Sequence, residues 1–282
     1  MRCSLSGIGD NRIIIVRGGG DLATGVVQKF YRAGFNVLIL ETHAPTAIRR
    51  SVALCEAVYD GFVTVEDITC RKISGTDELE ECWREKVVPL LIDPEGESIG
   101  RIKPAAVVDA ILAKRNTGTK RSMADITIAL GPGFTAGKDV DAVIETVRGH
   151  DLGRLILQGS AKPDTGVPGD IGGESIKRVI RASSDGAVRH IKKIGDIVEQ
   201  GEVIFTVDSV EPGGLEVISA EVCATISGLL RGLIREGMQV YKGMKVADID
   251  PRTDVDWHTI SDKARCLGGA ALEAYFFLRE KG

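Results

Sequence analysis

The sequence predicts an α/β fold, with a doubly wound parallel sheet, joined to a smaller all-β domain. Residues 13–25 pass from a β-branched apolar run through three glycines into helical spacing. Strand and helix patterns then alternate as far as residue 159, which is typical of a parallel sheet with helices on both faces. The rest of the chain repeats itself at a fixed offset. We therefore expect a Rossmann-like domain followed by a β-sandwich formed by an internal repeat.

The first glycine loop has the pattern of a dinucleotide-binding turn. Gly18, Gly20 and Ala23 match the spacing G-x-G-x-x-G/A. The first glycine permits the tight turn, the second lets backbone N–H groups approach a phosphate, and the small third residue lets the helix pack closely. Asp21 and Thr24 lie in the first turn of the following helix, whose start carries partial positive charge. These five residues are candidate cofactor-binding positions.

Glu41 is a further candidate because it ends the next predicted strand, 37–41. Dinucleotide-binding folds place a carboxylate about twenty residues after the glycine loop, where it accepts a hydrogen bond from a ribose hydroxyl. The competing interpretation is a glycine-rich turn that only packs tightly.

A second glycine loop follows the predicted strand 125–130 and contains Gly131, Gly133 and Gly137. The usual strand order of a doubly wound sheet makes this strand the neighbour of 13–17, so the two loops would face each other across a crevice. We expect helices over 105–114 and after residue 139, since the apolar residues there have helical spacing.

Two arginines extend this candidate site. Pro45 suits the first turn of a helix that would carry Arg49 and Arg50 near the carboxyl edge of the sheet. Basic residues at a helix start oppose the helix dipole unless they face an anion. Contact with a phosphate is one interpretation, and solvated surface arginine is the other.

Composition narrows the function classes. The chain has 282 residues, 43% of them hydrophobic and 27% charged, with a formal net charge of −4. No basic block is present, which argues against nucleic-acid binding. No apolar run has the length of a membrane span, and residues 1–9 lack the core of a signal peptide, so we expect a cytoplasmic protein. The six cysteines are scattered, without ligand spacing, which predicts free thiols and no metal site, with a single reactive thiol among them as the alternative.

The second half of the chain contains the repeat. Gly186 and Gly195 match Gly228 and Gly237, each pair 42 residues apart. The predicted domains are 1–160 (cofactor-binding), 161–180 (Pro/Gly-rich connector), 181–252 (duplicated β domain) and 253–282 (C-terminal helix). The repeated pattern resembles the halves of a biotinyl/lipoyl-like domain. Such a domain carries its modified lysine at the hairpin between the halves, but 208–216 contains no lysine, so we expect a docking or lid element.

Over nearly its whole length the chain resembles the YqeB-type accessory proteins of selenium-dependent molybdenum hydroxylases, which are related to XdhC-type proteins. The motifs that carry the resemblance include Arg17–Gly25, Ile48–Arg50, Leu130–Gly137, Glu145–His150 and Ile260–Arg265. The resemblance implies a maturation protein that binds a molybdopterin dinucleotide, the molybdenum cofactor, in the crevice and delivers it to an apo molybdenum hydroxylase, such as a xanthine or purine hydroxylase. It implies no catalytic residue, and a homo-oligomer stays open.

The residues themselves keep two other functions open. An NAD(P)-dependent oxidoreductase is favoured by Glu41 but lacks a clear acid/base pair. A non-catalytic binding module would use the glycine loops only as structure.

Overall fold

The computed structural model describes residues 11–210 and 217–281, and the chain divides into two units. The first, which we call the sheet unit, takes residues 11–45, 53–164 and 260–281. The second, the repeat unit, takes 46–52 and the described part of 165–259. Cys3 and residues 211–216 of the predicted hairpin lie outside the described residues.

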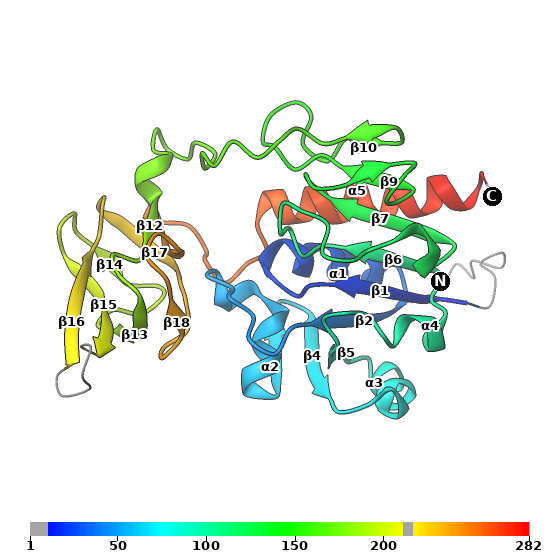
Figure 1. Cartoon of the computed structure of the whole chain (residues 1–282), viewed down its shortest axis with the longest axis horizontal. Coiled ribbons are helices and arrows are strands. Elements are labelled where there is room, and N and C mark those ends of the chain that lie inside the picture. Colours follow the sequence, from blue (N-terminus) through cyan, green and yellow to red (C-terminus); the bar gives the residue numbers. More distant parts are fainter. Residues whose placement is uncertain (1–10, 211–216, 282) are drawn as a thin grey trace. The chain divides into compact units, whose positions relative to one another are not determined.

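The sheet unit is built on a mixed sheet whose described strands run in the order β10-β9-β7-β6-β1-β2-β5-β4-β3 (Figure 1). The strands that pair in parallel are β1 (Ile13–Arg17), β2 (Asn36–Glu41), β4 (Ile68–Ile73), β5 (Val88–Ile92), β6 (Ala106–Asp109), β7 (Ile126–Leu130) and β9 (Ala142–Ile144). The antiparallel edge strands are β3 (Phe62–Val65) and β10 (Leu155–Ile156), and β8 (Thr135–Ala136) pairs separately with β11 (Gly159–Ser160). The inner strands are almost continuously apolar because both faces of the sheet are covered.

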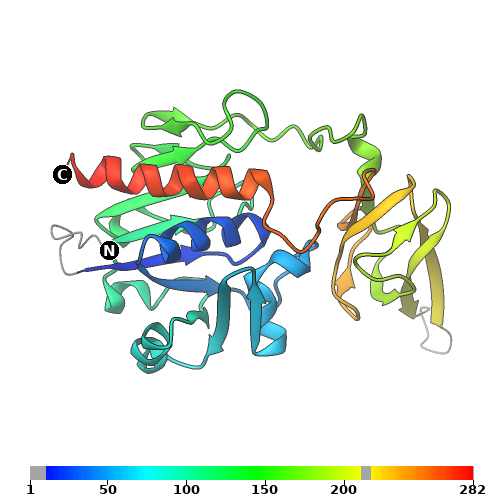
Figure 2. The ribbon, with the colours of Figure 1, turned by 180° about the vertical axis from the view of Figure 1, so that it is seen from behind.

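Two long helices, α1 (Asp21–Arg32) and α5 (Asp262–Arg279), lie side by side on one face of this sheet (Figure 2). The other helices are short: α2 (Ala57–Asp60), α3 (Leu79–Arg84), α4 (Ile99–Ile102) and the 3₁₀ turns η2 (Leu54–Glu56), η3 (Thr76–Glu78) and η4 (Arg121–Met123). On the other face, Leu79 of α3 and Ile99 of α4 share a buried cluster with Ile15 and Leu38.

Two glycines let α1 and α5 touch through their backbones. A Cβ atom on Gly25 would lie 2.2 Å from the carbonyl oxygen of Ala264, and one on Gly268 would lie 2.2 Å from that of Gly25. Further along, the rings of Phe30 and Tyr275 pack edge to face with centroids 5.9 Å apart. The two helices therefore run in the same direction and begin at the same edge of the sheet. The close approach of α1 therefore explains a glycine at position 268 inside a helix.

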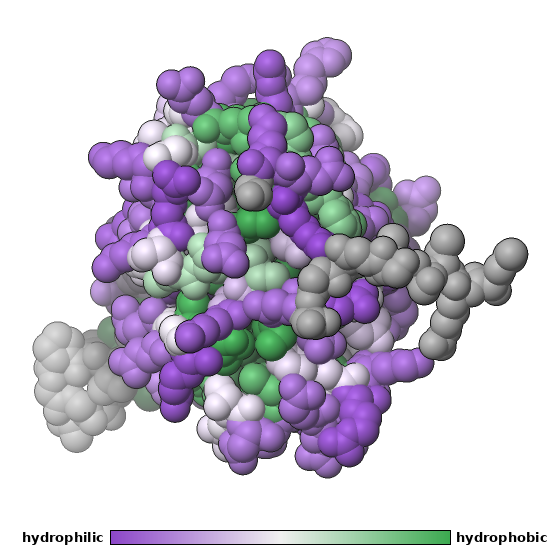
Figure 3. All heavy atoms as spheres, turned by 90° about the vertical axis from the view of Figure 1, so that its right-hand side faces the viewer, coloured by the Kyte–Doolittle hydropathy of each residue, from purple (hydrophilic) through white to green (hydrophobic). Residues whose placement is uncertain are grey.

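The edge of the sheet unit at which β1 begins faces the viewer in Figure 3, where apolar atoms form separate patches among hydrophilic ones. No helix in residues 11–210 and 217–281 has the length and apolarity needed to cross a membrane.

The repeat unit contains two antiparallel sheets, with the described strands in the orders β12-β19-β17-β14 and β16-β15-β13-β18. Their bounds are β12 (Val179–Arg181), β13 (Gly186–His190), β14 (Ile197–Val198), β15 (Val203–Val210), β16 (Val217–Cys223), β17 (Gly228–Leu233), β18 (Gln239–Val240) and β19 (Lys245–Asp250). The turns η1 (Arg50–Val52) and η5 (Ile176–Arg178) complete the unit. Phe205, Val207, Leu230 and Ile249 are part of its buried core.

The two halves of the repeat make equivalent contacts. Arg189 contacts Asp208 at 2.7 Å, and Arg231, 42 residues after Arg189, contacts Asp250 at 2.8 Å. The first ion pair has an exposed arginine, whereas the second is largely buried and shares Arg231 with Asp248. The local strand geometry therefore recurs with the sequence.

The predicted fold class requires correction. Residues 106–109 form strand β6 where a helix is predicted, and β6 takes the place beside β1 that is predicted for 125–130. Residues 142–144 form strand β9, again where a helix is predicted. Short apolar runs with alanine and valine satisfy helical spacing, but in this sheet they are buried on both faces as strands.

The prediction for the region after Pro45 is also wrong. This region contains the turns η1 and η2 where one amphipathic helix is predicted. The protein is thus a large mixed sheet plus antiparallel sheets. The predicted combination of a Rossmann-like doubly wound sheet and a biotinyl/lipoyl-like sandwich is wrong.

Candidate nucleotide site at the carboxyl edge of the sheet

The turn between β1 and α1 begins with a glycine that the backbone requires. Gly18 has φ +93°, and a Cβ atom there would lie 3.0 Å from the Cα atom of Ile111, just after β6. Its N–H donates to the carbonyl oxygen of Leu40 at 2.8 Å. A side chain at this position would meet both steric and conformational strain. Gly18 therefore fixes the tight turn that the sequence pattern predicts.

Gly20 is different because neither its backbone nor its neighbours require glycine. It caps α1 with φ −66° and ψ −179°, an extended conformation that any residue adopts. A Cβ atom on Gly20 would have no heavy atom of the described residues within 4 Å, apart from its chain neighbours. The direction in which a side chain would point is therefore open space at the start of a helix.

Two other positions of the motif support this turn. Ala23 is buried, and the Thr24 hydroxyl donates to the carbonyl oxygen of Gly20 at 2.9 Å. The Thr24 oxygen also accepts the N–H of Leu54 at 3.1 Å. Thr24 therefore joins the start of α1 to η2 and has a structural role.

Glu41 reaches the glycine turn from the end of β2. One carboxylate oxygen accepts the N–H of Gly19 at 2.8 Å, and the other accepts the N–H of Thr42 at 2.8 Å. Burial raises the pKa of Glu41, and the two backbone hydrogen bonds oppose this effect. Each oxygen retains acceptor capacity, so a hydroxyl group of a ligand has a place to donate.

Acidic side chains surround Cys55, which lies against the glycine turn. The Cys55 N–H donates to the carbonyl oxygen of Gly19 at 2.8 Å, which places this buried cysteine directly beneath the turn. Burial raises the pKa of the Cys55 thiol, and the charges of Glu41, Glu56 and Asp21 raise it further. Cys55 is thus held as a neutral thiol, which does not suit a nucleophile.

The second glycine loop has structural explanations. Gly131 and Gly133 have φ +77° and +107°, and Cβ atoms there would lie 2.8 Å from the Thr146 hydroxyl and 2.6 Å from the Arg115 backbone. Gly137 has φ +83° and its N–H donates to Val140 at 2.7 Å. Because β6 separates β7 from β1, this loop follows a strand that is not the neighbour of β1.

Arg49 and Arg50, the two arginines predicted near the site, belong to the repeat unit. Arg50 Nε donates to the carbonyl oxygen of Leu233 at 2.8 Å, and Arg49 donates to that of Thr259 at 3.4 Å. Both guanidinium groups thus bind backbone of their own unit.

A buried polar chain beneath Gly18 is absent from the sequence-based candidates. Arg17 donates to the Thr119 hydroxyl at 2.5 Å, and that hydroxyl donates to Asp109 at 2.5 Å. Arg17 also donates to the carbonyl oxygen of Pro94 at 2.6 Å. Burial raises the pKa of Asp109, while the hydroxyl and the nearby guanidinium oppose it. These hydrogen bonds join the ends of β1 and β6. The signal in the sequence is a charged residue at the end of each of these apolar strands, Arg17 and Asp109.

Glu145 and Arg148, three residues apart after β9, make separate contacts. Glu145 follows β9 and accepts backbone N–H groups from Thr146, Val147 and Lys162 at 2.7–2.8 Å. Arg148 instead binds Asp262 in the first turn of α5 at 2.8 Å. The loop after β9 is thus fastened to the start of α5.

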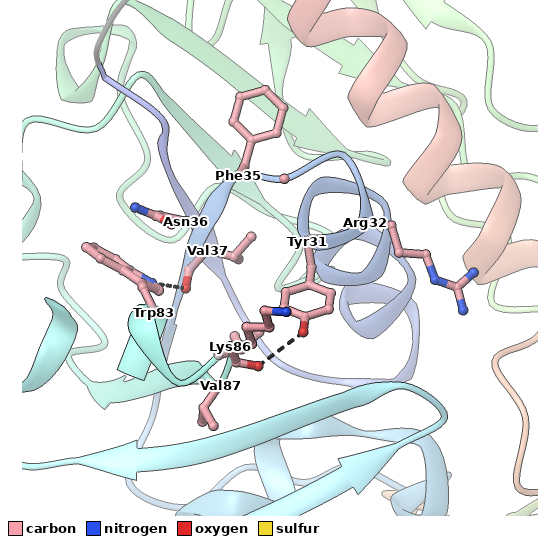
Figure 4. A pocket seen from close by; sticks show the side chains of 10 residues that line it. Tyr31, Arg32, Phe35, Asn36, Val37, Trp83, Lys86 and Val87 are labelled. Carbon is pink, nitrogen blue, oxygen red and sulfur yellow. Dashed lines mark hydrogen bonds between the residues drawn. The ribbon is translucent and has the colours of Figure 1, made fainter. Parts of the chain in front are cut away.

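A cavity of about 370 Å³ lies at the opposite edge of the sheet, where β2 and β5 begin (Figure 4). Two polar side-chain groups that line it already have partners. Trp83 Nε1 donates to the carbonyl oxygen of Val37 at 3.0 Å, and the Tyr31 hydroxyl donates to that of Lys86 at 3.1 Å. Open α/β sheets bind ligands at the carboxyl ends of their strands, which favours the glycine turn. Among the described residues, no group of three or more His, Cys, Asp or Glu side chains is placed to hold a metal ion.

No family model matches the chain. A protein of Escherichia coli K12 named "Uncharacterized protein YqeB" is 45% identical over 273 residues, which are 96% of this chain and 49% of that protein. The chain therefore spans about half the length of the curated relative it matches. That name gives no activity.

Solved structures give only distant likenesses. An aspartoacylase family protein of Mesorhizobium loti has a TM-score of 0.26 at 13% identity, covering 75% of this chain and 56% of that one. The ectoine utilization protein EutE of Ruegeria pomeroyi has 0.26 at 10%, covering 85% of each chain. A succinylglutamate desuccinylase of Silicibacter has 0.27 at 12%, covering 85% and 84%.

These comparisons correct the function implied by the sequence motifs. The solved structures are named as aspartoacylase, desuccinylase and ectoine utilization proteins, and none is named as a molybdenum cofactor protein. The predicted maturation of a molybdenum hydroxylase is therefore set aside. TM-scores of 0.26 and 0.27 bring no activity to this chain either.

Proposed function

We propose that the sheet unit binds a dinucleotide whose two halves are joined by a pyrophosphate, with a phosphate beside Gly20 and a ribose at Glu41. The observation that carries this proposal is the open space at Gly20. A glycine that neither φ nor packing requires is explained by a ligand that needs the volume of a side chain.

The start of α1 provides donors for the phosphate. The first N–H groups of a helix have no intrahelical acceptor, and the helix dipole favours negative charge there. Gly20 has no side chain that caps these groups. A phosphate oxygen would take the place of the missing cap.

Glu41 gives the site its preference for an unmodified ribose. Its carboxylate is held by the N–H groups of Gly19 and Thr42, so it is fixed in one orientation. Fixed acceptors suit the two hydroxyl groups of a ribose, whereas a 2′-phosphate would meet like charge. NAD and a molybdopterin dinucleotide share the required pyrophosphate, whereas NADP carries the disfavoured phosphate.

Isothermal titration calorimetry with NAD, NADP and cytidine diphosphate, beside native mass spectrometry of protein from its own host, tests the proposal. Tighter binding of NAD than of NADP supports the proposal. A co-purified pterin mass would identify a molybdopterin dinucleotide as the bound ligand. Absence of binding to all probes, with no co-purified nucleotide, would remove the proposal.

The compartment is part of this proposal. The described cysteines Cys55, Cys70 and Cys82 are buried free thiols. Reduced thiols fit the cytoplasm, where the common dinucleotides are present.

A further inference from the structure

Lys263 occupies the first turn of α5, on the stripe that faces the sheet. Leu267, Ala270, Ala271 and Ala274 continue this stripe at helical spacing and are buried. Because α5 begins at the edge where the parallel strands end, a residue one turn before Leu267 lies over the carboxyl ends of the strands. That edge also carries the glycine turn of α1.

The position of this turn is fixed on three sides. The Ser261 hydroxyl caps α5 by accepting the N–H of Ala264 at 3.2 Å. Ala264 packs directly against Gly25 of α1. Asp262 binds Arg148 of the loop after β9 at 2.8 Å. Lys263 is therefore held between the start of α1 and the end of β9.

The charges that face Lys263 come from each of these elements. Asp21 of α1, Glu145 after β9 and Asp262 of α5 are acidic, whereas Arg148 is basic. Burial lowers the pKa of the Lys263 ammonium, Arg148 lowers it further, and the three carboxylates oppose them. Lys263 makes no hydrogen bond or ion pair with any residue in 11–210 or 217–281.

Two lysines elsewhere in the sheet unit have carboxylate partners. Lys114 contacts Asp164 at 2.6 Å, and Lys162 contacts Asp151 at 2.5 Å. These pairs lie at the surface, where solvation already compensates an ammonium group. A half-buried ammonium without a direct acceptor is the arrangement that costs free energy until an anion arrives.

We propose that Lys263 is the cationic contact for the phosphate groups of the ligand, placed opposite the glycine turn and fixed by the start of α5. This inference rests on the proposed nucleotide site. Lys263 would supply positive charge beside the acidic residues that surround the glycine turn. The ligand class is a nucleoside diphosphate or a larger pyrophosphate, because a nucleoside alone offers no anion. The competing role is internal compensation of Asp21 and Glu145.

The two roles give different results when Lys263 is replaced. ADP-ribose and adenosine are the two probes; ADP-ribose adds a pyrophosphate and a second ribose, and only the pyrophosphate is charged. If Lys263 binds phosphate, Lys263→Gln weakens ADP-ribose at least about tenfold and leaves adenosine unchanged, and Lys263→Arg restores part of the affinity. Lys138→Gln, at an exposed lysine of the second glycine loop, is the matched control and should change neither.

A second readout keeps the proposal testable without nucleotide affinity. Reductive methylation of the full chain, quantified by mass spectrometry, should be slowed at Lys263 but not at Lys138 by inorganic pyrophosphate. Equal labelling with and without pyrophosphate, or equal loss of both probes in Lys263→Gln, overturns the inference. Protection of Lys263 by pyrophosphate in a chain that binds no ADP-ribose or NAD would instead overturn the dinucleotide proposal and retain the anion contact.

Discussion

The carboxylate of Glu41 accepts the backbone N–H of Gly19 at 2.8 Å, and this bond joins the end of β2 to the glycine turn after β1. The same carboxylate binds the N–H of Thr42. One side chain thus orders the turn and presents fixed acceptors beside the open space at Gly20.

The choice between NAD and NADP should depend on Glu41. The wild-type chain should prefer NAD, and Glu41→Gln should reduce that preference because the repulsion of the 2′-phosphate is lost. Since burial raises the pKa of Glu41, the wild-type preference should shrink as pH falls through that pKa. Dissociation constants for both cofactors at neutral and mildly acidic pH measure this. The same pH dependence in Glu41→Gln would show that another group is responsible.

Adjacent glycines of α5 should respond in opposite ways to one added methyl group. Gly268→Ala places a Cβ atom 2.2 Å from the Gly25 carbonyl oxygen, so we expect a loss of about 1–3 kcal/mol or more in unfolding free energy. Gly269→Ala adds a methyl group in open space within the helix and should be neutral or stabilising by up to about 1 kcal/mol. Urea denaturation measures both. Similar midpoints for the two variants would contradict the close approach of α1 and α5.

The buried hydroxyl of Thr119 bonds both Arg17 and Asp109, so its removal should destabilise the sheet unit. We expect Thr119→Val to cost about 1–3 kcal/mol because two buried polar partners lose a hydrogen bond. The hydroxyl of Thr117, two residues earlier, is buried without a hydrogen-bond partner among the described residues, so Thr117→Val should cost little. Equal costs in thermal unfolding would argue against the polar chain.

Acid stability should depend on Asp67. Its two hydrogen bonds with Arg32, at 2.8 and 2.7 Å, lower the pKa of Asp67 to about 2. A carboxyl group with a lowered folded-state pKa stabilises the protein above its unfolded pKa, and this contribution is lost as pH falls. Unfolding free energy should therefore decline from about pH 4 towards pH 2, with a shallower slope in Asp67→Asn. Parallel pH profiles for the two proteins would refute the assignment.

The local parts of the fold could be predicted from the sequence. The passage from Ile13–Arg17 through glycines into α1 depends on neighbouring residues, and β1 and α1 form where the pattern places them. Strand β6 could not be predicted, because its short apolar run fits either period until β1 and β7 pair on both sides of it.

The same limit applies to the site. Glu41 was predictable from its distance along the chain to the glycine turn. Lys263 was not, because α5 returns to the turn from more than two hundred residues away and its packing depends on Gly25 and Gly268. Charged groups brought together by such long-range packing leave no spacing signal.

Calorimetric titration of NAD into the wild-type chain and into Gly20→Ser tests the central claim most directly. Serine is a favourable helix N-cap, so the variant should be at least as stable as the wild type, while its side chain occupies the open space and caps the donors of α1. We predict that the wild type binds NAD and that Gly20→Ser loses at least about tenfold in affinity, equivalent to about 1.4 kcal/mol. Unchanged NAD affinity in a folded Gly20→Ser would contradict a phosphate site at this turn.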